Sequence, residues 1–227
     1  KTDDLLEKFL ISYDKYVDEI GRKLIIVDVE SDDPDKQFND RWLPYKHIWR
    51  THEENIGYAR AVNEAIASED GHAMYYVNLG IFNADTEFVD EGAVDSCLDL
   101  LDSNDDIAVV GPLQYDSRGR ITHAGIFGTN EKPMHRAWLS KDKNSHRYIE
   151  DCISVSGSAY FTKRSVWDEM TQCGLYQQAA PGATGAFLPT PHYYEETYCS
   201  YHMREHGYRV LYNGKAEMIH EWHKASA

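Results

Sequence analysis

The sequence predicts a three-layer α/β fold built on a mostly parallel central sheet. Two observations carry this prediction. Apolar runs typical of buried strands alternate with helical patterns through the first half of the chain, and acidic side chains stand where several of these runs end. The second half adds segments that fit antiparallel strands, so a smaller antiparallel portion is expected beside the parallel one.

The elements of the first half follow from their periodicity. Apolar residues from Leu5 to Ile20 recur at three- and four-residue steps, which indicates an amphipathic helix that ends at Gly21. The run 23–29 is short, apolar and followed closely by acids, as a buried parallel strand is. The further elements expected here are a loop and helix over 55–67, a strand over 74–77, a helix over 90–101 and a strand over 107–111.

The second half is interpreted by the same rules. The expected elements are an edge hairpin over 119–127, a strand over 152–162, a helix over 164–170, a helix over 194–206 and a strand over 209–212. Polar and aromatic stretches at 35–49 and 131–147 are expected to form loops. Because no repeat or low-complexity tract divides the chain, a single domain over 1–227 is expected.

Composition excludes several classes of function. A chain of 227 residues with 42% hydrophobic content can bury a sizeable core. A formal charge of −15 argues against binding to nucleic acid or to an anionic membrane surface, because phosphates are held by clustered Lys and Arg. An anionic ligand would therefore need local help from a metal ion or from backbone N–H groups.

Location is indicated by what the sequence lacks. It has no apolar run of about 18 residues that would span a membrane. The start Lys1-Thr2-Asp3-Asp4 does not have the basic-then-apolar pattern of a signal peptide. The four cysteines contain no C-x-x-C pair and are expected to be buried free thiols. With no N-x-S/T sequon either, a cytoplasmic location is expected.

Acidic residues mark the edge of the predicted sheet where a ligand would bind. Asp28, Asp85 and the pair Glu195-Glu196 follow apolar runs or open a helix, and ligands of open α/β sheets bind at the carboxyl ends of strands. Each acid taken alone fits a turn or a helix cap equally well. Together with His220, which ends another apolar stretch, they favour a site for Mg²⁺ or Mn²⁺ with positions left for phosphate oxygens.

Short motifs along the chain then occur in a recognisable order. They are Ile26-Val27-Asp28, Asn55-Ile56-Gly57, Phe82-Asn83-Ala84-Asp85, Gly111-Pro112, Ser156-Gly157-Ser158, Tyr194-Glu195-Glu196 and Ile219-His220. In this order they resemble the large inverting glycosyltransferase family of the GT-A fold, particularly its rhamnosyltransferase-like branch, over nearly the whole of 5–223. The resemblance implies a metal-dependent enzyme that transfers a sugar from a nucleoside-diphosphate sugar to a hydroxyl group of a glycan or other acceptor, with inversion.

The resemblance also implies roles for individual residues. The residues matched to the nucleotide-sugar donor are Asp28, Asp33, Asn55, Gly57, Arg60, Asn63, Asn83 and Gly157. Asp85 matches the last acid of the family's Asp-x-Asp metal motif, and His220 matches a late histidine that also reaches the metal, Mn²⁺ or Mg²⁺. On this reading 1–110 form the nucleotide-sugar-binding half and 111–227 the acceptor and catalytic half.

The expected catalytic and acceptor residues lie in the second half. Glu195-Glu196 match the family's Glu-Asp pair, whose second member is the usual candidate for the general base. Trp138 is the candidate for the acceptor site, because it lies in a polar segment with His135 and Arg136 and offers a large aromatic face.

Three departures from the family's pattern affect these roles. Asn83 replaces the first Asp of the metal motif, which keeps an oxygen ligand but removes one charge. Glu196 replaces the common Asp and is longer by one methylene, so Glu195 is a second candidate for the base. The chain opens within the part that matches the family's first helix, so the first strand is expected upstream, since a sheet without it would have two unpaired edges.

Two alternatives stay open at this point. One is a non-catalytic nucleotide- or carbohydrate-binding module on the same scaffold, which Asn83 and Glu196 would fit. The other is a retaining GT-A transferase, because the same metal site serves a different direction of attack there. No pattern in the sequence indicates the donor base, the sugar, the acceptor or the oligomeric state.

Overall fold

The structure is a computed structural model that describes residues 3–17, 22–29, 47–52, 56–67, 76–172, 185–190 and 193–221. Its helices are α1 (Asp3–Tyr16), α2 (Tyr58–Ala67), α3 (Ala93–Asp102), α4 (Arg164–Gln172) and α6 (Glu195–Glu205), with a 3-10 turn over Asn144–His146. Its strands are β1 (Leu24–Val29), β2 (His47–His52), β3 (Asn78–Phe82), β4 (Thr86–Phe88), β5 (Ile107–Tyr115), β6 (Ile121–His123), β7 (Ile126–Thr129), β8 (Lys132–His135), β9 (Ile149–Asp151), β10 (Ala159–Lys163) and β11 (Arg209–His220). None of the helices in these ranges has the length and apolar character needed to cross a membrane.

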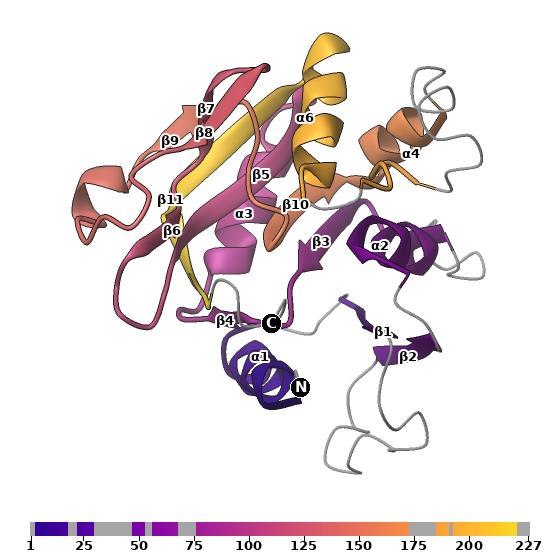
Figure 1. Ribbon diagram of the computed structural model, residues 1–227, viewed down its shortest axis with the longest axis horizontal. Helices are drawn as coiled ribbons and strands as arrows, with labels where there is room; N and C mark the ends of the chain where they lie inside the picture. The colour runs from indigo at the N-terminus through magenta and orange to yellow at the C-terminus, as the bar shows by residue number, and fades with distance from the viewer. Residues whose placement is uncertain are drawn as a thin grey trace.

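The strands form one large sheet and two small ones. The large sheet has seven strands in the order β3-β10-β5-β11-β4, with β6 beside β5 and β9 beside β11. Strands β5 and β11 pair in parallel, whereas the other pairs of this sheet are antiparallel. Strands β1 and β2 form a parallel pair, and β7 and β8 an antiparallel pair. Figure 1 shows β1 and β2 beside α2, apart from the large sheet.

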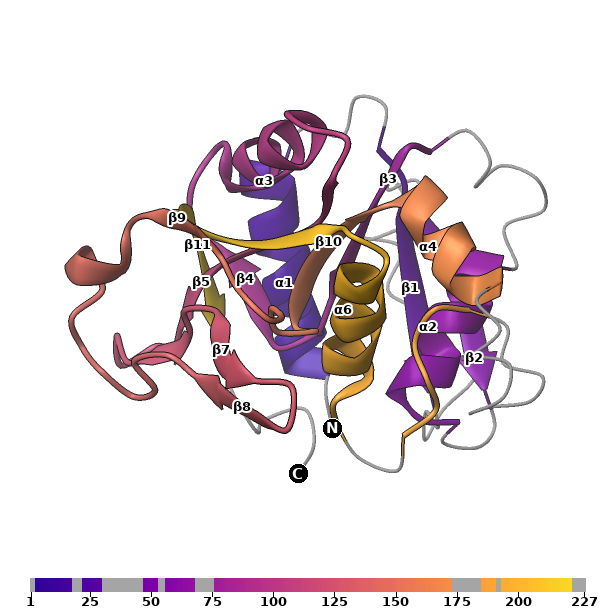
Figure 2. The ribbon, with the colours of Figure 1, turned by 90° about the horizontal axis from the view of Figure 1, so that it is seen from above.

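Helices cover both faces of the large sheet (Figures 1 and 2). On one face, α1 and α3 bury an apolar cluster that includes Phe9, Leu101 and Phe161. On the other face, α2, α4 and α6 bury a second cluster around Trp167 and Phe187. Strand β5 lies between the two layers and is buried along almost its whole length, as expected of a central strand. The predicted three-layer α/β class is therefore confirmed.

Helix α1 is fixed to the sheet by one buried hydroxyl group as well as by its apolar side chains. Ser12 Oγ donates to the Phe9 carbonyl at 2.8 Å and accepts the N–H of Phe88 on β4 at 3.0 Å. Phe9 and Tyr13 pack against the ring of Phe88. The Ser12 hydroxyl therefore has both a donor and an acceptor role inside the protein. These two bonds fix the position of α1 relative to β4, which non-directional apolar packing alone would not do.

Several predicted elements differ from the structure. The predicted strand at 74–77 is wrong over its described part, because 76–77 precede β3, which begins at Asn78. The apolar run before Asn78 suggested the strand, whereas β3 alternates Leu79 and Ile81 with Asn78 and Gly80. The predicted hairpin at 119–127 is also wrong, since β6 pairs with β5 and β7 pairs with β8. The parallel share of the sheet is smaller than expected, because β10 and β4 run antiparallel to their neighbours.

The expectation of a further strand concerns β1 and β3. Within the described ranges, β1 pairs with β2 and β3 pairs with β10, and neither has a described partner on its second edge. The expectation itself stays a prediction. The expected free thiols are confirmed for Cys97, Cys152 and Cys199, which are buried. Burial raises the pKa of the Cys152 thiol to about 12, so this thiol stays protonated.

Candidate active site

A pocket of about 1600 Å³ opens where several strands of the fold end. It brings together eight residues that the sequence singles out: Gly57, Asn83, Asp85, Trp138, Gly157, Glu195, Glu196 and His220. One wall is apolar and comes from β1, β3, α1 and α2, with Ile26, Ile81 and Val62 among its residues. The other wall is polar and comes from the turn after β3, the segment before β10, the start of α6 and the end of β11.

The register of two strands brings Asp85 and His220 together. Strand β4 pairs with β11 so that Thr86 lies opposite His220, and Asp85 directly precedes Thr86. The N–H of Glu221 donates to the Asp85 carbonyl at 2.9 Å, which extends this pairing by one residue. As a result His220 Nε2 lies 3.5 Å from Asp85 Oδ1, and both residues are buried.

This pair has an oxygen atom that a cation would satisfy. Asp85 Oδ1 is buried and accepts no hydrogen bond within the described part of the chain. Its separation from His220 is too long for a strong hydrogen bond. The described residues hold no cluster of three or more His, Cys, Asp or Glu side chains that could hold a metal. Among the described residues, Asp85 and His220 are the candidate ligands for a metal here, which would complete its shell with further oxygen atoms from water and phosphate, as Mg²⁺ often does.

Glu196 stands in the first turn of α6, where two effects on its ionisation compete. Burial raises the pKa of Glu196 to about 7, and the neighbouring charge of Glu195 contributes to this rise. Hydrogen bonds to the carboxylate from its own N–H and from the N–H of Gly157 oppose it. A carboxyl group with a pKa near 7 is suited to accept a proton at neutral pH.

The segment Ser156–Ser158 links the acid on α6 to the acid after β3. The phenol of Tyr58 donates to the Gly157 carbonyl at 2.6 Å, and the Gly157 N–H donates to Glu196. On the other side, the N–H of Asn83 donates to the Ser158 carbonyl at 3.1 Å. Gly157 has little room for a side chain, because an added Cβ would lie 3.3 Å from the Tyr58 hydroxyl oxygen. This segment, named the linking loop below, contacts both the start of α6 and the turn after β3, and so fixes the two acid-bearing segments relative to each other.

Two residues that no sequence pattern indicates fix the linking loop. Tyr58 opens α2, and burial raises its pKa well above the usual value, as do the charges of Glu196, Glu195 and Asp85. His123 at the end of β6 is buried, and its Nε2 accepts the N–H of Ser156 at 3.3 Å. The bonds of Tyr58 to Gly157 and of His123 to Ser156 join residues 99 and 33 positions apart in the sequence, so no local pattern identifies them.

Some predicted donor-site residues do not line the pocket. Arg60 is exposed and pairs with Glu64 on the same helix, with Nε and Oε1 2.6 Å apart. Asn63 is buried, and its amide bonds both the carbonyl and the N–H of Phe187, at 2.7 and 3.1 Å. Both of its polar ends serve the segment 185–190, which is a structural role.

Three donor-site predictions fall at or beyond the limits of the described chain. Asp28 lies on β1 opposite Thr51, and its backbone position is all that is described. Asp33 and Asn55 lie outside the described residues.

Comparison with known proteins establishes the fold. No protein-family model matches the chain, and no curated protein does. Among solved structures, the crystal structure of GalNAc-T7 with UDP, GalNAc and Mn²⁺ matches 96% of this chain with a TM-score of 0.70 and 14% identity. The mannosyltransferase PcManGT from Pyrobaculum calidifontis, in complex with GDP-Man and Mn²⁺, matches 97% with a TM-score of 0.64 and 14% identity. The chain spans 40% and 54% of the lengths of these two proteins.

Both neighbours are glycosyltransferases of the GT-A class, and this chain has the same type of fold. At 14% identity the likeness defines the architecture and leaves the reaction to be argued from the residues of the pocket.

Proposed function

We propose that this protein is a metal-dependent glycosyltransferase that transfers a sugar from a nucleoside-diphosphate sugar to an acceptor hydroxyl group, with inversion. One observation carries the proposal: the same pocket contains the buried pair Asp85 and His220 and the carboxyl group of Glu196 with its pKa near 7. The likeness to two transferases that were crystallised or complexed with nucleotides and Mn²⁺ supports it.

The electrostatics of the pocket argue for a cation with the donor. A diphosphate would enter beside Asp85, Glu195 and Glu196 in a chain with a formal charge of −15. The negative charges of the diphosphate and of these carboxylates would repel each other strongly in a pocket from which much of the water is excluded. Asp85 and His220 would hold the metal ion, Mn²⁺ or Mg²⁺, which when bound neutralises the diphosphate leaving group.

The donor would lie along the apolar wall, with its diphosphate toward Asp85. Gly57, with φ of 78°, adopts a backbone conformation that side chains disfavour, and it lets the chain pass close to the pocket before α2. Asn83 and Gly157 border the same space from the turn after β3 and from the linking loop. We retain Asp28, Asp33 and Asn55 as donor-binding predictions.

Glu196 is the proposed general base. Its carboxylate takes the proton of the acceptor hydroxyl as the hydroxyl oxygen attacks the anomeric carbon on the face opposite the leaving diphosphate. The Gly157 N–H orients this carboxylate, and the positive end of α6 favours its charged form. Glu195 is buried beside it and helps raise its pKa, so we assign Glu195 a supporting role.

The experiment is donor binding and turnover in Asp85→Asn. We measure thermal stability with UDP-, GDP-, dTDP- and CDP-sugars in Mn²⁺, in Mg²⁺ and in EDTA, followed by detection of transferred or released sugar with the donor that binds. We expect a metal-dependent shift in the wild type that Asp85→Asn loses. Asp99→Asn on the exposed side of α3 is the matched control and keeps the shift.

Two results would contradict the proposal. Full turnover in Asp85→Asn would remove the metal pair from the mechanism. Donor binding in the wild type with neither transfer nor hydrolysis would instead favour the binding module, for which Asn83 in place of an acid is the supporting observation.

A further inference from the structure

Unusual backbone conformations occur at two places along the lining of the pocket. Among the described residues, the non-glycine residues with positive φ are Ala137, Leu139, Tyr193 and Tyr194, with values between 54° and 75°. Each such residue costs about 1 kcal/mol or more, so it persists only where its surroundings enforce it. Ala137 and Leu139 flank Trp138, and Trp138, Tyr193 and Tyr194 all line the pocket. The strain therefore coincides with three aromatic side chains, named the aromatic rim below.

Hydrogen bonds hold the backbone of the rim in these conformations. The N–H of Leu139 donates to the Ile121 carbonyl at 2.8 Å, and the N–H of Ile121 donates to the Ser140 carbonyl at 2.7 Å. These two bonds tie the turn around Trp138 to β6. On the other side, the hydroxyl of Thr190 donates to the Tyr193 carbonyl at 2.8 Å. These bonds hold the backbone at Leu139 and at Tyr193 before any ligand binds, which lowers the entropy cost of binding.

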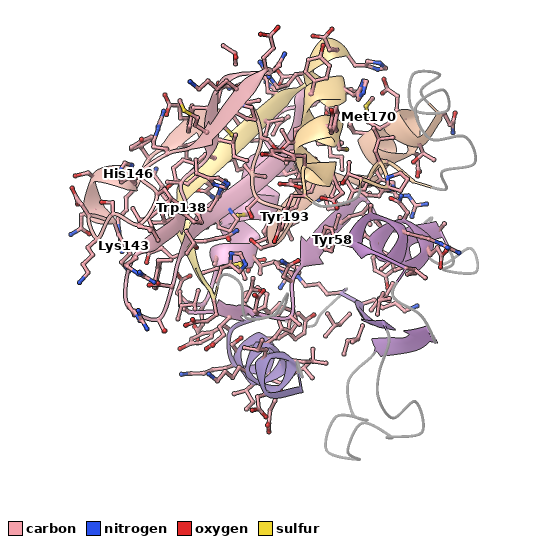
Figure 3. The ribbon with its side chains drawn as sticks, in the orientation of Figure 1. Tyr58, Trp138, Lys143, His146, Met170 and Tyr193 are labelled. Atoms are coloured by element: carbon pink, nitrogen blue, oxygen red, sulfur yellow. The ribbon has the colours of Figure 1, made fainter. Side chains whose placement is uncertain are left out.

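The ring of Trp138 packs against one of a pair of histidine rings. The imidazole of His135 packs against it with ring centroids 5.2 Å apart, and His123 packs edge-on against His135 at 5.7 Å. Tyr193 and Tyr194 are 60% and 56% exposed, so large parts of their surfaces stay open to a ligand. In Figure 3, Tyr58, Tyr193 and Trp138 follow one another across the centre of the view, from α2 toward the segment after β8.

The chemistry of the rim selects the kind of ligand. Aromatic side chains with polar edges suit a molecule that has one apolar face and a hydroxylated edge, which is the form of a sugar ring. Tyr194 adjoins the acids Glu195 and Glu196, which disfavour a second anion beside it, whereas the basic lining residues Arg22, Lys23 and Arg164 come from the segment before β1 and the start of α4. Tyr194 directly precedes Glu195-Glu196 at the start of α6, and the rim and the proposed base line the same pocket.

We propose that the aromatic rim is the acceptor subsite and that it binds an uncharged glycan, with a sugar ring stacked on Trp138 and flanked by Tyr193 and Tyr194. Its role as an acceptor subsite rests on the proposed glycosyltransferase function. Glycan binding by the rim does not, and it is measurable without turnover.

The experiment measures glycan binding and donor binding separately. Methyl glycosides and disaccharides of glucose, galactose, mannose and N-acetylglucosamine are tested by saturation-transfer NMR and calorimetry with wild type, Trp138→Ala, Trp138→Phe and Tyr198→Ala. Tyr198 is an equally exposed tyrosine on α6 that does not line the pocket, which makes it the matched control. We expect Trp138→Ala to weaken binding of the best glycan roughly tenfold, Trp138→Phe to weaken it less, and Tyr198→Ala to leave it unchanged.

Thermal shifts with the donor panel separate the possible failures. Unchanged melting temperature and donor shift in Trp138→Ala show that the variant is folded. If the wild type binds a glycan but no donor, the proposed glycosyltransferase function is contradicted, whereas glycan binding by the aromatic rim is retained. Donor turnover with equal glycan affinity in wild type and Trp138→Ala, or with no glycan of the panel bound, would overturn the rim and keep the enzyme.

Discussion

A carboxylate in the first turn of a helix normally ionises well below neutrality, because the helix dipole and free N–H groups favour its charged form. Glu196 stands in that position, yet burial and the neighbouring Glu195 raise its pKa to about 7. The raised pKa has two consequences that are measured independently, one for the rate of the reaction and one for the stability of the fold.

The rate should follow the ionisation of Glu196. Because only the carboxylate accepts a proton, we expect kcat/KM, which follows the ionisation of the free enzyme, to rise with pH and to reach half of its maximum near pH 7. Glu196→Gln removes the acceptor and should lower kcat by about 10²- to 10⁴-fold, while the donor still binds. The check is a pH profile of kcat/KM beside donor thermal shifts. Wild-type kcat in Glu196→Gln would assign the base to another residue, with Glu195 first in line.

The ionisation of Glu196 should lower the stability of the fold as the pH rises, whereas it should raise the rate of the reaction. The pKa of Glu196 is higher in the folded state than in the unfolded chain, where it is about 4.3. Its contribution to stability is therefore complete below pH 4.3 and is lost as the pH rises through 7. Glu196→Gln avoids this loss, and we expect it to raise the unfolding free energy at pH 8 by on the order of 1–2 kcal/mol after allowing for partial exposure.

Melting curves at pH 4 and pH 8 in the absence of donor measure this effect. The variant should gain a few degrees at pH 8 and little at pH 4. Glu91→Gln, an exposed glutamate before α3, serves as the control and should show the same melting temperature as wild type at both values. An equal change in Glu196→Gln at both pH values would mean that packing, and not ionisation, governs its stability.

At the scale of elements, the linking loop is the part on which the site depends most. It contacts Glu196 through the Gly157 N–H and the turn after β3 through the Ser158 carbonyl. Tyr58 on α2 holds it from outside through the Gly157 carbonyl. A displacement of this loop therefore moves the base relative to the metal pair without removing either one.

Tyr58→Phe tests this dependence. Removal of the 2.6 Å hydrogen bond should cost about 1 kcal/mol of stability, lower kcat more than it changes donor affinity, and move the kcat profile to higher pH. The shift is upward because a weaker Gly157 N–H contact stabilises the carboxylate less. Tyr208→Phe loses a bond of the same 2.6 Å length, to Glu169, far from the pocket. It should cost similar stability and leave the pH profile in place; a parallel shift in Tyr208→Phe would exclude a specific role for the loop.

Elements were predictable from the sequence where a local pattern determines them. The helices predicted at 5–20, 55–67, 90–101, 164–170 and 194–206 overlap α1, α2, α3, α4 and α6. Within the first two, apolar residues recur at helical steps, because one face of each helix is turned toward the interior. Strand β3 was placed too early, since Asn78 and Gly80 interrupt its apolar pattern. Strand β8 lies in a stretch expected to be a loop, since its pairing with β7 and not its own apolar content makes it a strand.

The site was predictable only in part, for a related reason. Asp85 and His220 were predictable because each stands at the end of an apolar run, where a sheet presents its ligands, and the two glutamates because they open a helix. Asn63 was assigned to the donor, whereas a polar residue within a helix pattern is equally often a structural anchor, as its bonds to Phe187 show. His123 and Tyr58 act through tertiary hydrogen bonds, for which the sequence has no spacing rule.

At the scale of the whole molecule, the net charge and the pocket act in the same direction. The formal charge of −15 produces a negative potential around the protein, and Asp85, Glu195 and Glu196 add to it at the polar wall of the pocket, whose lining also includes the basic residues Arg22, Lys23 and Arg164. A nucleoside diphosphate approaching without a cation is repelled by both. Salt shortens the range of this repulsion from about 20 Å at 20 mM to about 7 Å at 200 mM, whereas a bound divalent cation cancels it locally.

The salt dependence of nucleotide binding should therefore change with the metal. In EDTA, we expect UDP and GDP to bind more tightly as NaCl rises from 20 to 200 mM, because screening weakens the repulsion. In Mn²⁺ the gain should vanish or reverse, since the cation attracts the diphosphate and salt screens that attraction. Uridine and guanosine carry no charge, so their affinities are the control and should not depend on salt. Calorimetric titrations at both salt concentrations measure these affinities. If UDP and GDP in EDTA bind more weakly as the salt concentration increases, the pocket has a positive local potential. The donor would then not need a cation to overcome repulsion.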